Sequence, residues 1–273
     1  MNRLIWHNNL TFNSNQIKKH IQFVKQNLHG LLPLYPLEYQ HLQSYAKRTD
    51  IPITTLASIR NLVKIQEEIY RSQISPESKE KIQESFKQLT KNIHIESPSK
   101  HKYLIDRFFS SNKFSVKNIL KIVGMVPEYK QLSHDTLKKL FQYMKDIEAA
   151  ENDSKIRSMD FEKKLSDWLK DHIRTPFQTE EMIRLSISSQ VSTPDILFDE
   201  PIEIQLDGKN YKILWIDAKN YALLNVPFII KSLTKQSDKY NKEIGPGAFV
   251  FHYGIDSNIK IGSTLILDGS MIG

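Results

Sequence analysis

Two short acidic motifs in the carboxyl-terminal half have residue types and a spacing that could support phosphodiester hydrolysis. Thr193-Pro194-Asp195 leads into an apolar run, and Asp217-Ala218-Lys219 ends another apolar run with Asp217 22 positions after Asp195. A divalent cation between two carboxylates activates water and neutralises charge on a phosphate, and a nearby ammonium adds to that stabilisation. We therefore expect Asp195 and Asp217 to be catalytic and to bind Mg²⁺ or Mn²⁺, with Lys219 beside the scissile phosphate.

Glu162 and the carbonyl of Ala218 are expected to complete this site. An apolar helical stripe runs along one face of residues 161–169, and Glu162 lies at its margin, from which a carboxylate can reach the edge of a sheet. Glu162 could bind the cation or orient a water on it, and Ala218 supplies a carbonyl oxygen of the kind that hard cations accept. Lys219 either polarises the attacking water or holds the phosphate, and both roles stay open.

An acid-x-Lys triplet by itself carries little information in a lysine-rich chain. Five other triplets fit the pattern: Glu77/Lys79, Glu128/Lys130, Asp153/Lys155, Glu162/Lys164 and Asp207/Lys209. None of these five follows an apolar strand that is itself preceded by Pro-Asp. The alternative is that Asp217 and Lys219 form an ordinary ion pair at the end of a surface strand.

Short strands in the second half of the chain must position these motifs. Strands are predicted at 202–206, 211–216, 248–253 and 264–267, because these runs are short and rich in β-branched and apolar residues. Asp207-Gly208 predicts a tight hairpin between the first two strands. Gly245-Pro246-Gly247 predicts a sharp helix-to-strand turn, because the Lys-Ser/Thr of a nucleotide-binding loop does not follow it.

Up to about residue 150 the chain has helical spacing, and two segments repeat one register. Ala46, Asp50, Ile53, Leu56 and Ile59 are spaced 4, 3, 3 and 3 positions apart, as are Phe109, Lys113, Val116, Ile119 and Ile122. This spacing is typical of helix-turn-helix units. If the second helices enter a DNA groove, the outward residues are Thr55, Ser58, Arg60 and Asn61 in one unit and Lys117, Asn118 and Lys121 in the other. The alternative is a helix pair that serves only for packing or for a protein partner.

Charge is distributed unevenly along the chain. Residues 1–150 contain 23 Lys and Arg against 13 Asp and Glu, whereas residues 151–273 contain 15 against 18. A basic region joined to a slightly acidic one suits a nucleic-acid grip beside a cation-binding unit, although a lysine-rich solvated surface explains the excess equally well. We expect two domains, residues 1–150 and 151–273, with the boundary in the polar stretch from Glu148 to Met159.

Composition excludes several classes of protein. The chain has no cysteine, so disulfides and thiolate metal sites are excluded, and any metal must take oxygen or nitrogen ligands. The amino terminus lacks the apolar core of a signal peptide, and the longest apolar stretch, Tyr221 to Ile230, is too short to span a bilayer. We expect a soluble intracellular protein without membrane association, nuclear and cytoplasmic if the source is eukaryotic.

The motifs resemble those of the TPD-domain family, to which the codanin-1-interacting nuclease belongs. The matching segments, in chain order, are Thr193 to Leu197, Trp215 to Lys219, Gly245 to Gly247 and Phe251 to Gly254. The resemblance implies an α+β protein overall. A helix-turn-helix region at 1–150 would precede an α/β, restriction-endonuclease-like PD-(D/E)xK domain with a mixed sheet at 151–273.

The resemblance also implies roles for two residues of a predicted helix. Gln236 and Tyr240 are similar to a Gln-x-x-x-Tyr motif of related nucleases, in which these side chains contact DNA or position the lysine. Two residues depart from the family pattern, since Asp217 stands where the family often has Glu, and Ser237 stands where an apolar residue is usual.

Motifs and resemblance together predict a Mg²⁺-dependent deoxyribonuclease that acts on structured or branched DNA. DNA is the expected partner, and the resemblance implies a codanin-like protein partner. A homodimer would supply two copies of the site for two scissile bonds. The alternative function is a non-catalytic DNA-binding adaptor that keeps the nuclease-like fold and holds a codanin-like protein.

Overall fold

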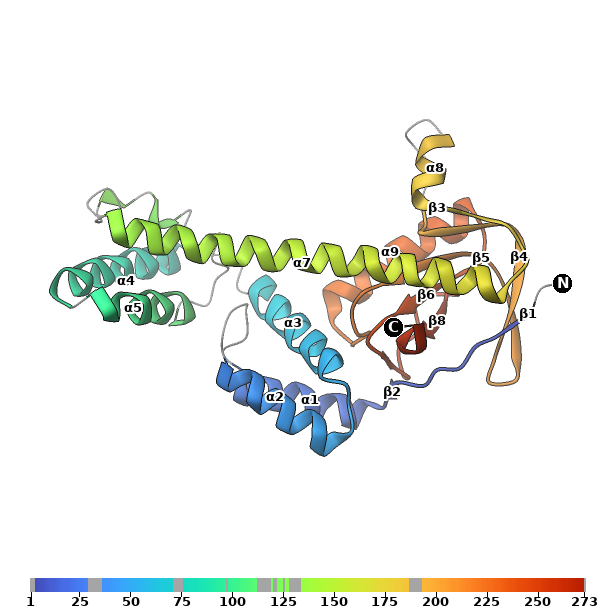
Figure 1. Ribbon diagram of the computed structural model, residues 1–273, viewed down its shortest axis with the longest axis horizontal. Helices are drawn as coiled ribbons and strands as arrows, with labels where there is room; N and C mark the ends of the chain where they lie inside the picture. The colour runs from blue at the N-terminus through green and yellow to red at the C-terminus, as the bar shows by residue number, and fades with distance from the viewer. Residues whose placement is uncertain are drawn as a thin grey trace. The chain divides into compact units, whose positions relative to one another are not determined.

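One part of the chain is built on a β-sheet and another on helices. The computed structural model describes residues 3–28, 36–70, 76–96, 98–111, 119, 122–124, 126–127, 134–186 and 193–272. One unit, here called the sheet unit, consists of Met1–Val24, Leu42–Arg60 and Ser154–Gly273, and the other, the helical unit, consists of Lys25–His41 and Asn61–Asp153. Figure 1 labels the helices and strands along the chain. No helix within the described ranges is long and apolar enough to cross a membrane.

A mixed sheet forms the centre of the sheet unit, which confirms the predicted mixed sheet and the α+β class. The path of the sheet runs through β1 (Arg3–Ile5), β4 (Ile196–Leu206), β5 (Lys209–Lys219), β6 (Gly247–Phe251) and β8 (Leu265–Asp268), and β3 (Phe177–Thr179) also pairs with β4. β4 is antiparallel to β3 and β5, whereas the pairs β1–β4, β5–β6 and β6–β8 are parallel. A parallel pair needs a crossover, and α9 (Pro227–Glu243) supplies it between β5 and β6.

Smaller elements complete the sheet unit. β2 (Thr11–Phe12) and β7 (Ile255–Asp256) form a separate parallel pair, a short helix, α8 (Glu180–Ser186), follows β3, and a 3-10 turn, η2 (Ser270–Ile272), follows β8.

The hairpin between β4 and β5 turns at Asp207-Gly208, as predicted. Asp207 has φ 48° and Gly208 has φ 74°, and Leu206 pairs with Lys209 across the turn. Two left-handed residues are typical of the two-residue turn that matches the twist of antiparallel strands. The turn lies at the opposite end of β5 from Lys219, so the start of β4 and the end of β5 meet at one edge of the sheet.

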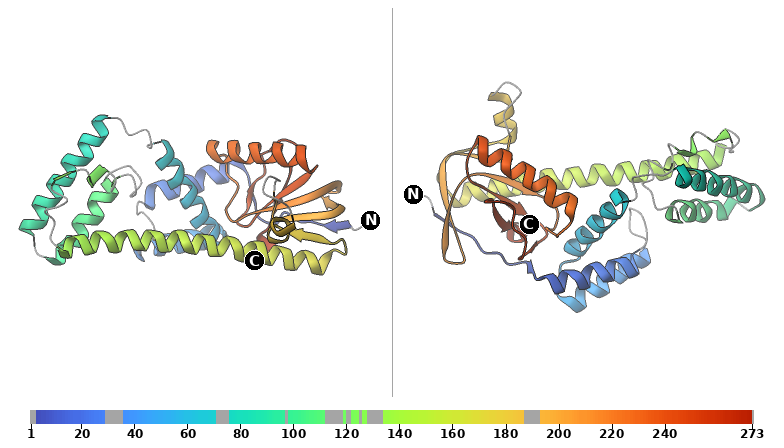
Figure 2. Two further views of the ribbon diagram at one scale, coloured as in Figure 1. Left: turned by 90° about the horizontal axis from the view of Figure 1, so that it is seen from above. Right: turned by 180° about the vertical axis from the view of Figure 1, so that it is seen from behind.

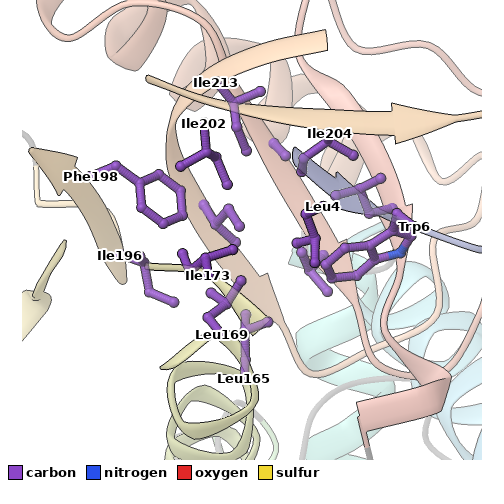
Figure 3. Packing of buried hydrophobic residues seen from close by; sticks show 14 of the residues in the cluster. Leu4, Trp6, Leu165, Leu169, Ile173, Ile196, Phe198, Ile202, Ile204 and Ile213 are labelled. Atoms are coloured by element: carbon purple, nitrogen blue, oxygen red, sulfur yellow. The ribbon is translucent and has the colours of Figure 1, made fainter. Parts of the chain in front are cut away.

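Helices cover both faces of the sheet. From α7 (His134–His172), Leu165 and Leu169 are fully buried and point toward the strands, where Ile196 belongs to the same core (Figure 3). α9 covers the other face, and its Tyr240 ring meets the Trp215 ring edge-on with centroids 5.0 Å apart. The apolar stripe predicted for residues 161–169 is therefore confirmed.

The amino-terminal segment belongs to the sheet unit, which differs from the predicted domain organisation. β1 adds to β4 in parallel, and Nε of Arg3 forms an ion pair with Glu203 at 2.7 Å. Further along, Nε1 of Trp6 donates to the Asp268 carbonyl oxygen at 2.9 Å, and the Asp268 carboxylate accepts the Leu10 amide at 2.7 Å. These contacts tie the start of the chain to its last strand rather than to a helical domain at 1–150.

The polar stretch that was predicted to contain the domain boundary is part of α7. This helix is continuous from His134 to His172 and contains neither Gly nor Pro, the residues that most readily end a helix. The division between the two units falls between Asp153 and Ser154, inside the helix. Composition alone does not distinguish a polar segment of a helix from a linker.

Asp50 replaces the glycine usually found in the turn between α2 (Pro36–Thr49) and α3 (Ile53–Tyr70). Asp50 has φ 53°, and the Ile51 amide donates to the Ala46 carbonyl at 3.3 Å. This bond pattern is that of a Schellman cap, and Asp is one of the few residues besides Gly that enter the left-handed region readily. α1 (Ser14–Asn27) packs beside α2 through the stacked rings of Phe23 and Tyr45, whose centroids are 3.7 Å apart.

The first half of α3 is turned inward, so the predicted outward orientation of Thr55, Ser58 and Arg60 is wrong. Their exposed fractions are 1%, 7% and 1%. Oγ of Ser58 accepts a hydrogen bond from the Ala222 amide at 2.8 Å, which ties α3 to the segment after β5. Asn61 is half-buried and belongs to the helical unit. These side chains therefore do not form an exposed row that could read a DNA groove.

The helical unit has a core of its own. It contains α4 (Pro76–Ile95) and α5 (Pro98–Ser111), and its buried side chains include Phe109, Ile119 and Ile122 of the second predicted register. The rest of that register, Lys113 and Val116, and the predicted outward residues Lys117, Asn118 and Lys121 lie outside the described residues.

Candidate active site

The two predicted motifs meet at one edge of the sheet. Asp195 immediately precedes β4, and Ile196 pairs with Ile216 in the antiparallel ladder, so the next positions, Asp195 and Asp217, stand opposite each other. Oδ2 of Asp195 accepts the backbone amide of Ala218 at 2.6 Å. The fold therefore brings Asp195 against the Asp217-Ala218-Lys219 motif.

Ala218 presents its backbone to Asp195. In an extended strand the amide and the carbonyl of one residue point to the same side. The Ala218 carbonyl oxygen is therefore directed toward the same strand edge as the amide that Asp195 accepts. Two carboxylates and one carbonyl are a set of hard oxygen donors, which is the type of set that Mg²⁺ and Mn²⁺ prefer. The residues present thus fit the predicted cation.

Asp217, Lys219 and Gln236 form a closed set of polar contacts. Nζ of Lys219 forms an ion pair with Oδ1 of Asp217 and donates to Oε1 of Gln236 at 3.0 Å, while Nε2 of Gln236 donates to Oδ2 of Asp217 at 2.7 Å. An ammonium can only donate and a carboxylate can only accept, so these contacts decide which end of the Gln236 amide faces each partner. Gln236 therefore holds the carboxylate and the ammonium in one geometry.

Tyr240 connects this set to the first motif. Its hydroxyl accepts a hydrogen bond from Nε2 of Gln236 at 3.1 Å and donates to the Thr193 carbonyl oxygen at 3.1 Å. Gln236 and Tyr240 are four positions apart on α9 and share a helix face. A single face of one helix therefore contacts both acidic motifs.

Burial makes the ionised forms of Asp195 and Asp217 unfavourable and raises the pKa of both carboxyl groups. Burial, and next to it the charge of Asp217, raises the pKa of Asp195 to about 8. Burial also raises the pKa of Asp217, although the Lys219 ammonium opposes this shift. Two carboxylates at close range in a poorly solvated site resist ionising together. A bound divalent cation would favour the ionised form of both.

Glu162 influences the site through its charge. Burial, followed by the charges of Glu180 and Asp217, raises the pKa of Glu162, and the charge of Glu162 contributes to the raised pKa of Asp195. Within the described ranges, no three Asp, Glu, His or Cys side chains converge in a geometry that could hold a metal. Ligation of one cation by Asp195, Asp217 and Glu162 together, as the sequence predicted, would thus require side chains of the site to move.

Glu180, which belongs to neither acidic motif, also borders the site. Its carboxylate accepts hydrogen bonds from Oγ1 of Thr193 at 3.3 Å and from Nη2 of Arg184 at 2.5 Å. Its backbone amide donates to the Asp195 carbonyl at 3.1 Å, and its charge contributes to the raised pKa of both Glu162 and Asp217. A glutamate at the start of a short helix belongs to no motif, so the sequence carried no signal for it.

The Gly245-Pro246-Gly247 turn fixes the position of β6 behind the site, which agrees with the predicted helix-to-strand turn. Nε1 of Trp215 donates to the Gly245 carbonyl at 2.8 Å, and the Leu214 amide donates to the Pro246 carbonyl at 2.7 Å. A Cβ at Gly247 would lie 2.0 Å from the Trp215 ring, so only glycine lets β6 pass this close. Trp215 precedes Asp217 by two positions on β5, so the turn supports the strand that carries the site.

The predicted DNA contacts fall into three groups. Gln236 and Tyr240 lie in the candidate site. Arg60 is 1% exposed and Asn61 is half-buried in the helical unit, so neither stands on an exposed reading face. Lys117 and Lys121 lie outside the described residues.

The fold and the site define an α+β protein with a mixed sheet and a buried acidic edge. A profile of the TPD family, described as "Protein of unknown function TPD sequence-motif", matches residues 128–269. The chain is also 40% identical over 273 residues to uncharacterized protein L539 of Acanthamoeba polyphaga mimivirus, a match that covers 100% of this chain and 97% of that protein. No solved structure matches the chain. The chain belongs to the TPD sequence-motif family, as the Thr193-Pro194-Asp195 motif predicted.

Proposed function

We propose that this chain is a metal-dependent nuclease of the PD-(D/E)xK type that hydrolyses DNA phosphodiester bonds, preferentially in branched or otherwise structured DNA. The observation that carries the proposal is the convergence of Asp195, Asp217 and Lys219 at one sheet edge, with Gln236 holding the last two. Asp217 is 4% exposed, whereas an ordinary surface ion pair would be solvated and would need neither a second carboxylate nor a bridging amide.

The geometry suggests a role for each group. Asp195, Asp217 and the Ala218 carbonyl would hold Mg²⁺ or Mn²⁺, which when bound supplies an activated water and neutralises charge on the phosphate. Lys219 would donate a hydrogen bond to a phosphate oxygen or to the attacking water. Glu162, whose charge acts on Asp195, would bind the cation or orient that water.

The test is cleavage of a substrate panel by the purified chain. Single-stranded, duplex, flap and four-way-junction DNA are incubated with Mg²⁺, Mn²⁺ or EDTA. Asp217→Asn and Lys219→Ala are expected to slow cleavage by about 100-fold or more, the size of effect seen when a group that stabilises transition-state charge is removed. Asp207→Asn and Lys209→Ala make the same charge changes at the opposite end of β5 and should cleave like the wild type. Equal cleavage by all four variants would exclude this site.

A non-catalytic DNA-binding adaptor for a codanin-like protein is the second candidate. It is favoured by the absence, in the part of the chain that the structure describes, of three converging metal-ligating side chains. Lys219 also forms an ion pair with Asp217, as it would in a site that binds no substrate. The adaptor predicts DNA binding with no metal-dependent cleavage of any substrate in the panel. A homodimer would bring two sites to two strands, and sedimentation of the chain with and without DNA tests that arrangement.

A further inference from the structure

Four lysines form a row along the outer face of α9. Lys231, Lys235, Lys239 and Lys242 are spaced 4, 4 and 3 positions apart, and all four are exposed. At 3.6 residues per turn and 1.5 Å per residue, they occupy an arc of about 80° and a length of about 16 Å along the helix. We call this set the α9 lysine row.

The charges of the row are available to a partner. Neither an ion pair nor a hydrogen bond connects any of the four lysines to another side chain of the described residues. The acidic residues of α9 are Asp238 and Glu243, which leaves the helix with an excess of positive charge. Residues 151–273 as a whole contain 15 Lys and Arg against 18 Asp and Glu. The row is therefore a positively charged surface within a region of net negative charge.

The helix that carries the row also holds the candidate site. The buried face of α9 packs on the sheet, and Gln236 reaches from this helix to Asp217 and Lys219. In the view from behind in Figure 2, α9 lies in front of the sheet. A polymer bound along the outer face of α9 would therefore be held by the same rigid element that positions the Lys219 ammonium.

We propose that the α9 lysine row binds the phosphate backbone of the nucleic-acid strand that the Asp195–Asp217 edge cleaves. The inference rests on the proposed nuclease function and names the surface that grips its substrate. One strand of duplex DNA carries a phosphate about every 3.4 Å, so a length of about 16 Å presents about five phosphates to four ammonium groups. Contacts of this kind position a strand without reading its sequence. A straight, regularly spaced row fits a regularly charged polymer better than it fits an irregular acidic protein surface.

The test measures binding without cleavage. A fluorescently labelled 30-base-pair duplex is titrated with the chain in EDTA between 50 and 200 mM KCl. Each lost phosphate contact lowers the slope of log affinity against log salt by about 0.9. Lys235→Gln/Lys239→Gln should therefore reduce the magnitude of this slope by about 2. Between 50 and 200 mM KCl, the loss of DNA affinity should then be about tenfold smaller in the variant than in the wild type.

Two matched variants accompany the measurement. Lys209→Gln/Lys212→Gln removes the same charge from exposed positions at the far end of β5 and should leave the slope unchanged. Lys235→Arg/Lys239→Arg keeps the charge and should keep the slope. All of these side chains are exposed, so each variant should unfold at the temperature of the wild type.

The outcomes separate this inference from the nuclease proposal. An unchanged slope in Lys235→Gln/Lys239→Gln overturns the inference, and so does an equal change in the Lys209→Gln/Lys212→Gln control. If only binding of a polyglutamate peptide depends on Lys235 and Lys239, the row is a protein-docking surface instead. DNA binding that depends on Lys235 and Lys239, without cleavage in the presence of Mg²⁺, would overturn the nuclease proposal and support the inference about the α9 lysine row. Cleavage by the wild type, combined with an unchanged salt slope in Lys235→Gln/Lys239→Gln, would overturn only the inference about the α9 lysine row.

Discussion

The side-chain amide nitrogen of Gln236 lies 2.7 Å from Oδ2 of Asp217, while the oxygen of the same amide faces the ammonium of Lys219 at 3.0 Å. A primary amide can satisfy an anion with one end and a cation with the other, which no carboxylate or hydrocarbon side chain of similar size can do. The positions of the Asp217 carboxylate and the Lys219 ammonium therefore depend on one residue of α9, Gln236.

Gln236→Glu should destabilise the chain in a pH-dependent way. The substitution places a carboxylate beside the buried Asp217 and removes its donor, so the free energy of unfolding should fall by about 1 to 3 kcal/mol at pH 7.5. The loss should be smaller at pH 5, because repulsion raises the carboxyl pKa values and a bound proton then relieves it. Thermal unfolding followed by circular dichroism at both pH values measures this. Gln22→Glu, at an exposed position of α1, should have little effect, and equal losses in both variants would contradict the prediction.

Asp195→Asn should change how stability depends on pH in metal-free buffer. The pKa of Asp195 is raised from 3.8 to about 8, so the native state binds the proton more tightly than the unfolded chain. This contribution to stability is fully present below the unfolded value and is lost as the pH rises through about 8. Asn can still accept the Ala218 amide, so the variant should equal the wild type near pH 4 and exceed it near pH 8. Asp199→Asn, at an exposed position of β4, should follow the wild-type curve.

Mg²⁺ or Mn²⁺ should stabilise the wild type at pH 8. A ligand that binds only the folded state at 100 times its Kd adds about 2.7 kcal/mol, which is readily measured as a rise in Tm. Asp217→Asn and Asp195→Asn each remove an oxygen ligand charge and should abolish most of the rise, whereas Asp207→Asn should retain it. An equal rise in Asp217→Asn would place the cation elsewhere.

Gly247→Ala should disrupt the support of β5. The added Cβ would meet the Trp215 ring at 2.0 Å, so the ring or β6 must shift, at a cost of about 3 kcal/mol. Chemical denaturation should show this loss as a lower midpoint. Gly208→Asn is the matched control, because a Cβ there has open space and Asn tolerates the left-handed backbone.

Ser58→Ala should affect stability and leave DNA affinity unchanged. The substitution leaves the Ala222 amide without its acceptor in a buried position, which costs about 1 to 3 kcal/mol. Ser44→Ala, at an exposed position of α2, should be neutral. A reduced DNA affinity without a change in stability would instead indicate that α3 reads DNA, as the helix-turn-helix interpretation requires.

The parts of the fold that depend on local sequence were predictable. Alternating apolar residues and the Asp207-Gly208 turn define β4 and β5, and the two acidic motifs lie at the strand ends that the hairpin brings together. The glycines at 245 and 247 likewise predicted the turn before β6. Each of these features is set by residues within a few positions of one another.

The features that escaped prediction depend on distant partners. β1 has three residues and pairs with Glu203, which lies 200 positions away, so no local pattern identifies it. Ser237 departs from the family pattern and is 0% exposed, yet its hydroxyl lies 2.5 Å from that of Thr264 on a remote segment. The inward face of α3 also depends on a remote contact, that of Ser58 with Ala222. A helical repeat shows which residues share a face but not which face is covered.

The parallel pairing of β1 with β4 has a consequence for synthesis of the chain. Residues 3–5 are synthesised before their partner strand, residues 196–206, which follows about 200 residues later, a delay of roughly 10 to 40 s at ordinary translation rates. During that interval Leu4 and Trp6, which are 4% and 1% exposed in the finished fold, have no sheet to cover them. The nascent chain thus carries an uncovered hydrophobic segment at Leu4 and Trp6 until β4 is made.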